Sequence, residues 1–199
     1  MIPLLGDWNK FDDIDFNKLP EQFVLKCNHD CGSVVFCTDK KTFDFENAQN
    51  KIELSLKRNY CDSHPWREWQ YRSIKPRIIA EQYLKNKNGN IPEDYKIHCF
   101  NGKPIYIRLV LNRFTENIRE AFYDVNWDLQ EFNVDYPKTG EQDPQPKNLD
   151  EILELSSALS KDIPFVRVDL YESNDKIFFG ESETPGKAGG LSCEPLKAV

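Results

Sequence analysis

Phe165-Val-Arg-Val-Asp-Leu-Tyr171, Glu172-Ser-Asn-Asp175 and Lys176-Ile-Phe-Phe-Gly-Glu181 follow one another near the end of the chain. The first and third segments are rich in β-branched and aromatic residues, which is typical of strands, and the middle one carries turn residues. We therefore expect a β-hairpin. Folding it about this turn brings Asp169 beside Glu181, within about one residue of register.

Two carboxylates on neighbouring strands repel each other and raise each other's pKa. A divalent cation removes that cost, and proteins commonly hold Mg²⁺ through one or two carboxylates together with substrate phosphates. Arg167 lies two residues before Asp169 and shares its strand face, where an arginine could grip such a phosphate. The alternative is a surface hairpin with ordinary charges.

Composition limits the class of protein. The 199 residues are 39% hydrophobic, enough for one domain or two small subdomains around a core. A net charge of −7 argues against nucleic acid as the main partner. No segment approaches the roughly 20 apolar residues of a membrane span. The start of the chain lacks the basic residues of a signal peptide, and the six cysteines are irregularly spaced, so we expect a cytoplasmic protein with reduced thiols.

The rest of the chain alternates between short strands and helical periodicity, which predicts an α+β fold with antiparallel strands. Asn101-Gly102 indicates a tight hairpin turn. Asp44 is expected to cap a helix that ends near Tyr60, and Asn148 a helix from Leu149 to Ser160 in a capping box with Glu151. Strands are expected at 23–27, 34–38, 76–84, 95–100, 104–111 and 122–125.

Lys26 lies inside an apolar strand, where a lysine is costly unless it is paired or functional. It directly precedes a polar loop whose glycine and backbone N–H groups could form a phosphate-binding nest. The alternative is an edge-strand lysine whose amine reaches solvent. The loop residues that could contact phosphate are Asn28, Asp30, Gly32 and Ser33.

Glu81 lies near the end of another apolar strand, where connector backbone could present N–H and C=O groups to an adenine edge. The alternative is a glutamate paired with Lys75 or Arg77. Asp94 and Lys96 open the next strand and could meet a ribose hydroxyl and a phosphate, or only each other's neighbours. The connector residues after Glu81 are Gln82, Tyr83 and Leu84.

Four segments, in this order, resemble the TupA-like ATP-grasp family, which is named after a protein of teichuronopeptide biosynthesis. Its members often occur with capsule and cell-wall polysaccharide genes, and some are labelled glycosyltransferases. The resemblance extends over nearly the whole chain. The segments are 23–33, 71–81, 94–103, and 165–171 followed by Phe179-Gly-Glu181.

The resemblance implies two α+β subdomains, residues 1–84 and 85–199, that enclose ATP. In the first, it assigns Lys26 to the ATP phosphates, the 28–33 loop to the triphosphate, and Glu81 with the backbone through Leu84 to the adenine. In the second, it assigns ribose and nucleotide contacts to Asp94 and Lys96, the transferred phosphoryl group to Arg167, and Mg²⁺ to Asp169 and Glu181.

Two departures from the family pattern are visible. Members usually have a further N-terminal region, with part of the substrate site, before the Ile-Pro-Leu-Leu-like segment that begins this chain. A partner chain or another copy could supply it. The last motif resembles Gly-Glu-x-Thr-Phe-x-Pro-Gly, whereas Gly180-Glu-Ser-Glu-Thr-Pro-Gly186 is one residue shorter. Glu183 is the candidate for a further metal ligand.

The resemblance therefore predicts an ATP-dependent carboxylate–amine ligase that acts through an acyl phosphate. Its substrates would be ATP, a carboxylate on a uronic-acid sugar or an amino acid, and an amine, in the synthesis of surface polysaccharide. A glycosyltransferase that uses a nucleotide sugar is an alternative enzyme, because the same acids could bind a diphosphate-bound metal. A non-catalytic nucleotide-binding remnant is a third hypothesis.

Overall fold

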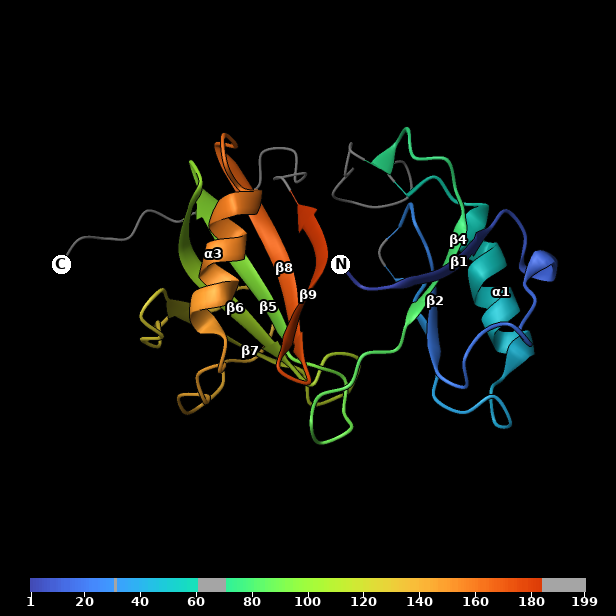
Figure 1. Cartoon of the computed structure of the whole chain (residues 1–199), viewed down its shortest axis with the longest axis horizontal. Coiled ribbons are helices and arrows are strands. Elements are labelled where there is room, and N and C mark those ends of the chain that lie inside the picture. Colours follow the sequence, from blue (N-terminus) through green and yellow to red (C-terminus); the bar gives the residue numbers. More distant parts are fainter. Residues whose placement is uncertain (31, 61–70, 184–199) are drawn as a thin grey trace. The chain divides into compact units, whose positions relative to one another are not determined.

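A computed structural model describes residues 1–30, 32–60 and 71–183 of the chain. The described residues form two compact units. One extends from Pro3 to Tyr83, and the other begins at Leu84 and also includes Met1 and Ile2. Each unit has its own antiparallel sheet and its own helix against that sheet (Figure 1).

The unit that begins at Pro3 contains a four-stranded sheet in the order β1-β4-β2-β3, with α1 packed on one face (Figure 1). Alternate residues of β2, Phe23 and Leu25, are fully buried against Ala48 and Ile52 of α1. The elements are β1 (Leu4–Trp8), η1 (Phe11–Asp13), β2 (Phe23–Cys27), β3 (Val35–Cys37), α1 (Phe45–Leu56) and β4 (Ile78–Gln82).

Helix α1 begins as predicted and ends early. The Asp44 carboxylate accepts a hydrogen bond from the Asn47 N–H at 2.9 Å, which confirms the predicted N-cap. The prediction that the helix continues to about Tyr60 is wrong. The Arg58 N–H bonds to the Ser55 carbonyl at 2.9 Å, three residues back, and closes a turn that ends the helix at Leu56.

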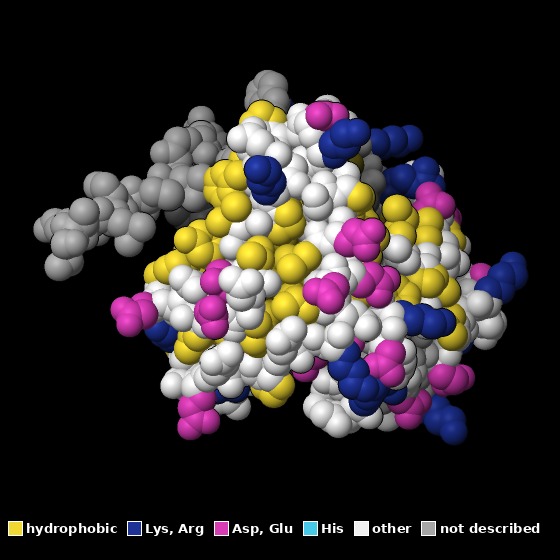
Figure 2. Space-filling model, turned by 60° about the vertical axis from the view of Figure 1, so that its left-hand side comes forward, with side chains coloured by type: hydrophobic (Ala, Val, Ile, Leu, Met, Phe, Trp, Pro, Cys, Tyr) yellow, Lys and Arg dark blue, Asp and Glu magenta, His cyan; other side chains and the backbone are white. Residues whose placement is uncertain are grey.

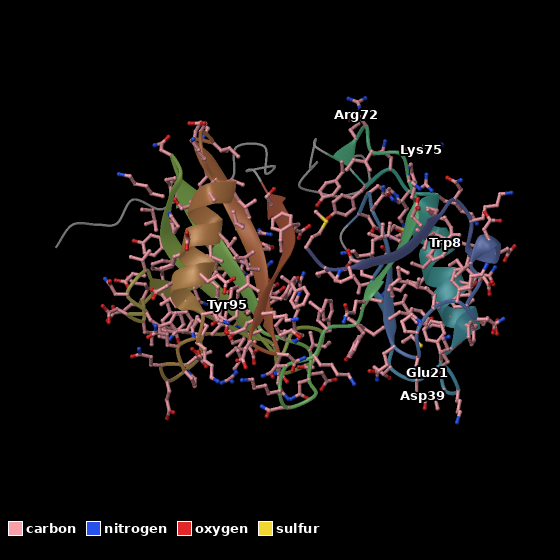
Figure 3. The ribbon with its side chains drawn as sticks, viewed as in Figure 1. Trp8, Glu21, Asp39, Arg72, Lys75 and Tyr95 are labelled. Carbon is pink, nitrogen blue, oxygen red and sulfur yellow. The ribbon has the colours of Figure 1, made fainter. Side chains whose placement is uncertain are left out.

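The unit that begins at Leu84 contains a five-stranded sheet in the order β7-β6-β5-β8-β9, and α3 covers one of its faces (Figure 1). Tyr95, labelled in Figure 3, belongs to the buried core between this face and α3. The elements are β5 (Asp94–Phe100), β6 (Lys103–Leu111), β7 (Arg119–Asp124), α3 (Leu149–Leu159), β8 (Phe165–Ser173) and β9 (Lys176–Glu183).

Both predicted hairpins of this sheet are confirmed. Asn101 and Gly102 have φ values of 49° and 77°, and Asn174 and Asp175 have 51° and 61°, so both turns use the left-handed backbone that short hairpins need. Asp169 pairs in register with Glu181, as expected. The register then shifts between Asp169 and Leu170, where a β-bulge interrupts the ladder.

Gly180 accounts for the shift. A Cβ atom at this position would lie 2.6 Å from the Tyr171 ring and 3.3 Å from the Asp169 carbonyl oxygen, so only glycine fits there. The glycine thereby lets β9 approach β8 closely at the point where Glu181 comes beside Asp169.

The predicted capping box of α3 is not formed. Asn148 is the N-cap residue, but its side chain makes no capping hydrogen bond. Its amide instead donates to Glu172 Oε1 on β8 at 3.2 Å. Helix α3 is therefore held mainly by burial of Leu149 and Ile152 against the sheet.

Acidic side chains are spread over the face shown in Figure 2, in keeping with the net charge of −7. Among the residues that the structure describes, no helix is long and apolar enough to cross a membrane.

Truncation of Ile152 tests the packing of α3. Ile152 is 0% exposed, so Ile152→Ala should lower the free energy of unfolding by about 2–5 kcal/mol. Leu155→Ala, on the same helix at 37% exposure, is the matched control and should change it by about 0.5 kcal/mol or less. Urea denaturation followed by circular dichroism measures both. Equal losses for the two variants would contradict this packing.

Candidate functional site

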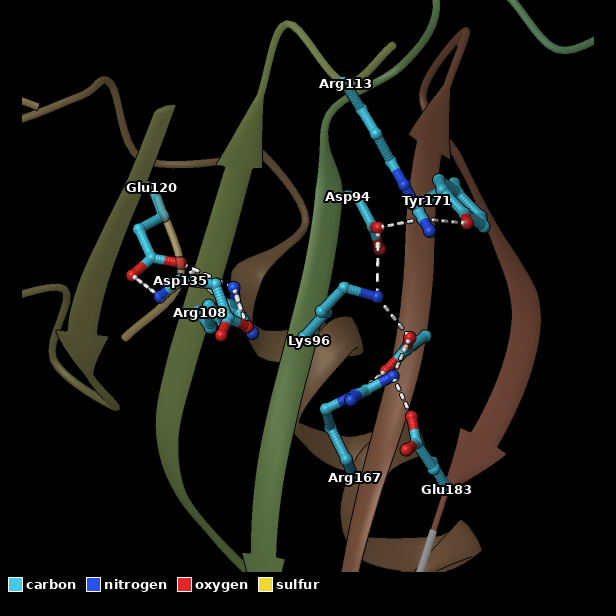
Figure 4. Close-up of polar contacts among 10 residues, drawn as sticks. Asp94, Lys96, Arg108, Arg113, Glu120, Asp135, Arg167, Tyr171 and Glu183 are labelled. Carbon is cyan, nitrogen blue, oxygen red and sulfur yellow. Dashed lines mark hydrogen bonds and ion pairs between the residues drawn. The ribbon is translucent and has the colours of Figure 1, made fainter. Parts of the chain in front are cut away.

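The face of the five-stranded sheet opposite α3 carries charged residues. Strand alternation directs Tyr95, Ile97 and Val168 toward α3 and the intervening residues to the other face. Buried ionic side chains there form a connected network (Figure 4). They are Asp94 and Lys96 of β5 and Asp169 of β8.

Asp169 is the centre of this network. Its carboxylate pairs with the Lys96 amine and accepts hydrogen bonds from Arg167 Nε at 2.7 Å and Nη2 at 2.9 Å (Figure 4). Burial alone would raise the pKa of Asp169, but the Lys96 and Arg167 charges outweigh it and hold that pKa below its usual value. Asp169 is therefore an ionised carboxylate between two cations.

Asp94 extends the network along β5. Its Oδ2 atom lies 3.0 Å from the Lys96 amine and 2.5 Å from Arg113 Nη1. Arg113 also approaches the Tyr171 hydroxyl, at 3.5 Å (Figure 4). The Oδ1 atom of Asp94 is buried and has no hydrogen-bond partner among the described residues. Such an oxygen is rare in a folded protein and leaves an acceptor free for a further donor.

Arg113 and Tyr171 are site residues that the sequence pattern does not indicate. Arg113 follows β6 and belongs to no recognisable sequence motif. Tyr171 has the pattern of any aromatic residue in a strand. Strand pairing brings them together: Asp94 pairs with Tyr171 on β8 and with Val110 on β6, three residues before Arg113. Asp94 and Lys96 pair with each other and with neighbouring charged residues, and their predicted contacts with a ribose hydroxyl and a phosphate stay predictions.

The predicted metal ligands have three different environments. Asp169 is paired with cations, and Glu183 pairs with Arg167 (Figure 4). Glu181 is an exposed residue, but nearby protein atoms partly desolvate its carboxyl group. This desolvation and the Asp169 charge raise the pKa of Glu181. Within the described ranges, no three His, Cys, Asp or Glu side chains converge on one point. Asp169 and Glu181 are carboxylates in register, the type of donor that a divalent cation takes, so Mg²⁺ at these two residues stays a prediction, while Glu183 pairs with Arg167.

A second ionic cluster lies on the same face, toward β7. Arg108 Nε donates to Glu120 Oε2 at 2.9 Å, and its Nη2 lies 2.9 Å from Asp135 (Figure 4). Glu120 is fully buried and also accepts from the Asp135 N–H at 2.9 Å. This cluster places a guanidinium beside Lys96, because Arg108 and Lys96 are register partners.

In the unit that begins at Pro3, Lys26 pairs with Glu81, with 2.8 Å between Nζ and Oε2. Their side chains are 32% and 18% exposed. Lys26 is not on an edge strand, since β2 lies between β4 and β3. Glu81 is the register partner of Val24, and Lys26, two residues further along β2, reaches it diagonally on the same face, while Arg77 pairs with Asp7. The roles of both residues toward a nucleotide stay predictions.

The loop after Lys26 is fastened by its own side chains. The Asn28 side chain accepts from the Arg77 N–H at 2.8 Å and donates to the Lys75 carbonyl at 3.2 Å. Ser33 Oγ accepts from the Cys27 N–H at 2.7 Å and donates to Asp30 at 2.5 Å.

The side chains of Asn28, Asp30 and Ser33 thus hold the loop together through hydrogen bonds within the protein, and their predicted contacts with phosphate stay predictions. Gly32 has φ +124°, and no atom of the described residues lies within 4 Å of its Cβ position, which leaves its backbone open on that side within the described part of the chain.

The predicted adenine connector continues from β4. The Gln82 N–H donates to the Pro3 carbonyl at 3.0 Å, and the Tyr83 ring lies 6.0 Å from that of Phe36. Leu84 is buried and begins the next unit. The connector's role toward an adenine stays a prediction.

Comparison with solved structures finds D-alanine–D-alanine ligase from Bacillus anthracis. The structure with ATP matches with a TM-score of 0.52 and 19% identity, covering 92% of this chain and 49% of the ligase. A second structure of that ligase matches with a TM-score of 0.51 and 20% identity, covering 92% and 51%. This likeness shows the fold alone, and the chain spans about half the length of the ligases it matches.

No protein with a curated description matches this chain. The family model described as TupA-like ATPgrasp, in contrast, matches residues 1–195. The two antiparallel sheets with their helices are consistent with that match. The chain therefore belongs to the TupA-like ATP-grasp family.

Proposed function

We propose that this chain acts in an ATP-dependent carboxylate–amine ligase, with Mg²⁺ held by Asp169 and Glu181. The observation that carries the proposal is the buried Asp169 carboxylate between Lys96 and Arg167, next to Glu181 in register. One acid is neutralised by cations and the other is left beside it with a raised pKa. Family membership supports the assignment of nucleotide to this face.

Phosphoryl transfer depends mainly on positioning and on neutralising charge. When bound, Mg²⁺ would neutralise charge on the phosphates. Lys96 is buried, and its amine touches Asp169 and Asp94, so it can exchange a carboxylate for a phosphate oxygen by a small movement. Arg167 spans Asp169 and Glu183 and would face the transferred phosphoryl group. In the other unit, Lys26 would contact the triphosphate.

The proposed reaction has two steps. A carboxylate oxygen of the acceptor attacks the γ-phosphorus, and the bond from that phosphorus to the ADP oxygen breaks, giving an acyl phosphate. The amine nitrogen then attacks the acyl carbon, phosphate leaves with its bonding electrons, and the amine loses a proton to give an amide. By family context, the acceptor carboxylate belongs to a uronic-acid sugar or an amino acid of surface polysaccharide synthesis.

Replacement of the central carboxylate tests this function. ADP release should require both a carboxylate and an amine, and Asp169→Asn should lower it roughly 100-fold, because the metal loses a ligand and two cations lose their counterion. Asp150→Asn, on the first turn of α3, is the matched control and should keep full turnover. Circular dichroism checks that both variants fold. Unchanged ADP release in Asp169→Asn would contradict the proposal.

Lys26 is testable by nucleotide binding alone. Lys26→Met removes the amine but keeps the aliphatic stem, so Mg-ATP affinity measured by calorimetry should fall about tenfold. Lys51→Met is the control, since Lys51 is an exposed residue of α1 whose amine donates to the Val34 carbonyl at 2.9 Å. Equal Mg-ATP affinities for wild type and Lys26→Met would remove Lys26 from the phosphate site.

Glu181 predicts a pH dependence of stability. Its folded pKa is raised, so the charged form destabilises the fold above the unfolded pKa, and this cost disappears as pH falls below it. Glu181→Gln should therefore raise the free energy of unfolding at pH 7 and not at pH 3.5, as urea denaturation would show. Glu183→Gln, which loses the pair with Arg167, should lower it at pH 7. A loss of stability in Glu181→Gln at pH 7 would contradict a pKa raised by partial burial and by the Asp169 charge.

A further inference from the structure

A cavity of about 280 Å³ lies at the end of the five-stranded sheet where β5 begins and β8 ends. Tyr95 and Leu109 line it from the sheet and belong to the core beneath α3, so the cavity is on the face opposite the Asp169 network. Residues 86–88 and 143–147 line its sides. Neither the proposed phosphoryl transfer nor the metal site uses this cavity.

The two segments at its sides are held in place by hydrogen bonds. The Tyr123 hydroxyl donates to the Asp143 carboxylate at 2.9 Å and accepts from the Asp143 N–H at 2.7 Å. The Asn86 side chain accepts from the N–H groups of Asn88 and Asn90, both at 3.0 Å. The cavity is therefore built by the fold of this unit.

Tyr95 brings a hydroxyl without a partner to this cavity. The residue is 5% exposed, and its ring centroid lies 6.4 Å from that of Trp127. Among residues 1–30, 32–60 and 71–183, the Tyr95 hydroxyl makes no hydrogen bond. Buried tyrosine hydroxyls usually have a partner, and a phenylalanine would pack as well without one. A ligand in the cavity would supply that partner.

Two carboxylates lie opposite each other at the same cavity. Glu93 precedes and Glu172 follows the register pair Asp94–Tyr171, so strand alternation puts both on the α3 face. Each accepts a hydrogen bond from a neutral amide, at 3.3 and 3.2 Å, and neither forms an ion pair within the described ranges. Like charges in this arrangement destabilise a sheet. The Tyr95 hydroxyl is near both, since their charges add to burial in raising its pKa.

The charges around the cavity select a cation. Four acids and two lysines line it. Both lysines are already paired, because the amines of Lys87 and Lys147 lie 2.6 and 3.6 Å from Asp175 Oδ1. Burial and the Asp175 and Glu93 charges raise the pKa of Glu172 in spite of the nearby Lys87. The space between Glu93 and Glu172 therefore favours a positively charged group over an anion or a neutral one.

We propose that this cavity binds a small molecule that carries a protonated primary amine on a carbon-rich body, with the ammonium group held by Glu93, Glu172 and the Tyr95 hydroxyl. An ammonium group has three N–H donors, one for each carboxylate and one for the hydroxyl oxygen. Leu109 and Leu111 offer apolar contacts to the carbon body. The volume is at the lower end for ligand pockets, which suits a small molecule. The site does not depend on the proposed ligase function.

Calorimetry of the full chain with three probes of similar shape tests the class of ligand. At pH 7, protonated phenethylamine should bind about tenfold more tightly than phenethyl alcohol, which lacks the charge, and hydrocinnamate should bind most weakly. Equal affinities for the amine and the alcohol, or preferred binding of hydrocinnamate, would overturn the proposal. Binding of a lysine-containing peptide without binding of phenethylamine would overturn it in favour of a protein partner.

Two conservative variants locate the binding site. Glu172→Gln keeps an acceptor for the Asn148 amide but loses the charge, so phenethylamine affinity should fall about tenfold. Tyr95→Phe loses only the hydroxyl, and the affinity should fall about fivefold. Glu154→Gln, at an exposed residue of α3, is the matched control and should keep the affinity. Circular dichroism checks folding, and unchanged affinity in either folded cavity variant would overturn the proposal.

Discussion

The Asp169 carboxylate, buried and held by Lys96 and Arg167, is the interaction on which the rest of the charged face depends. A buried ion pair is retained only when its charges are well matched, because removal of one partner leaves an unpaired buried charge. Here one carboxylate balances cations from β5 and β8. The same arrangement keeps Asp169 ionised and leaves Glu181 with a neighbouring negative charge. A divalent cation beside Glu181 would relieve this repulsion.

The sheet separates packing from chemistry by strand alternation. Ile97 and Val168 lie in the core beneath α3, whereas Lys96 and Asp169, one residue away on each strand, are on the opposite face. Register is therefore the decisive constraint, since a one-residue slip would bury the charges under the helix. Gly180 sets the last part of this register, because the bulge beside it brings Glu181 to Asp169.

Local patterns in the sequence predict the hairpins, the pairing of Asp169 with Glu181 and the N-cap of α1. They depend on turn residues and alternation, which operate over short distances. The patterns do not predict partners far apart in sequence. Arg113 meets Asp94, and Lys26 meets Glu81, only through strand pairing. The helix end at Leu56 and the diversion of Asn148 to Glu172 likewise depend on tertiary neighbours that compete with the local motif.

A crystal structure with a non-hydrolysable ATP analogue and Mn²⁺ tests the central claim most directly, because anomalous scattering locates the metal. The account predicts a Mn²⁺ peak roughly 2.0–2.2 Å from oxygens of Asp169 and Glu181, as for other hard divalent cations, with the Lys96 amine on a phosphate oxygen. A metal bound elsewhere with the nucleotide, while Lys96 and Arg167 still hold Asp169, would contradict it.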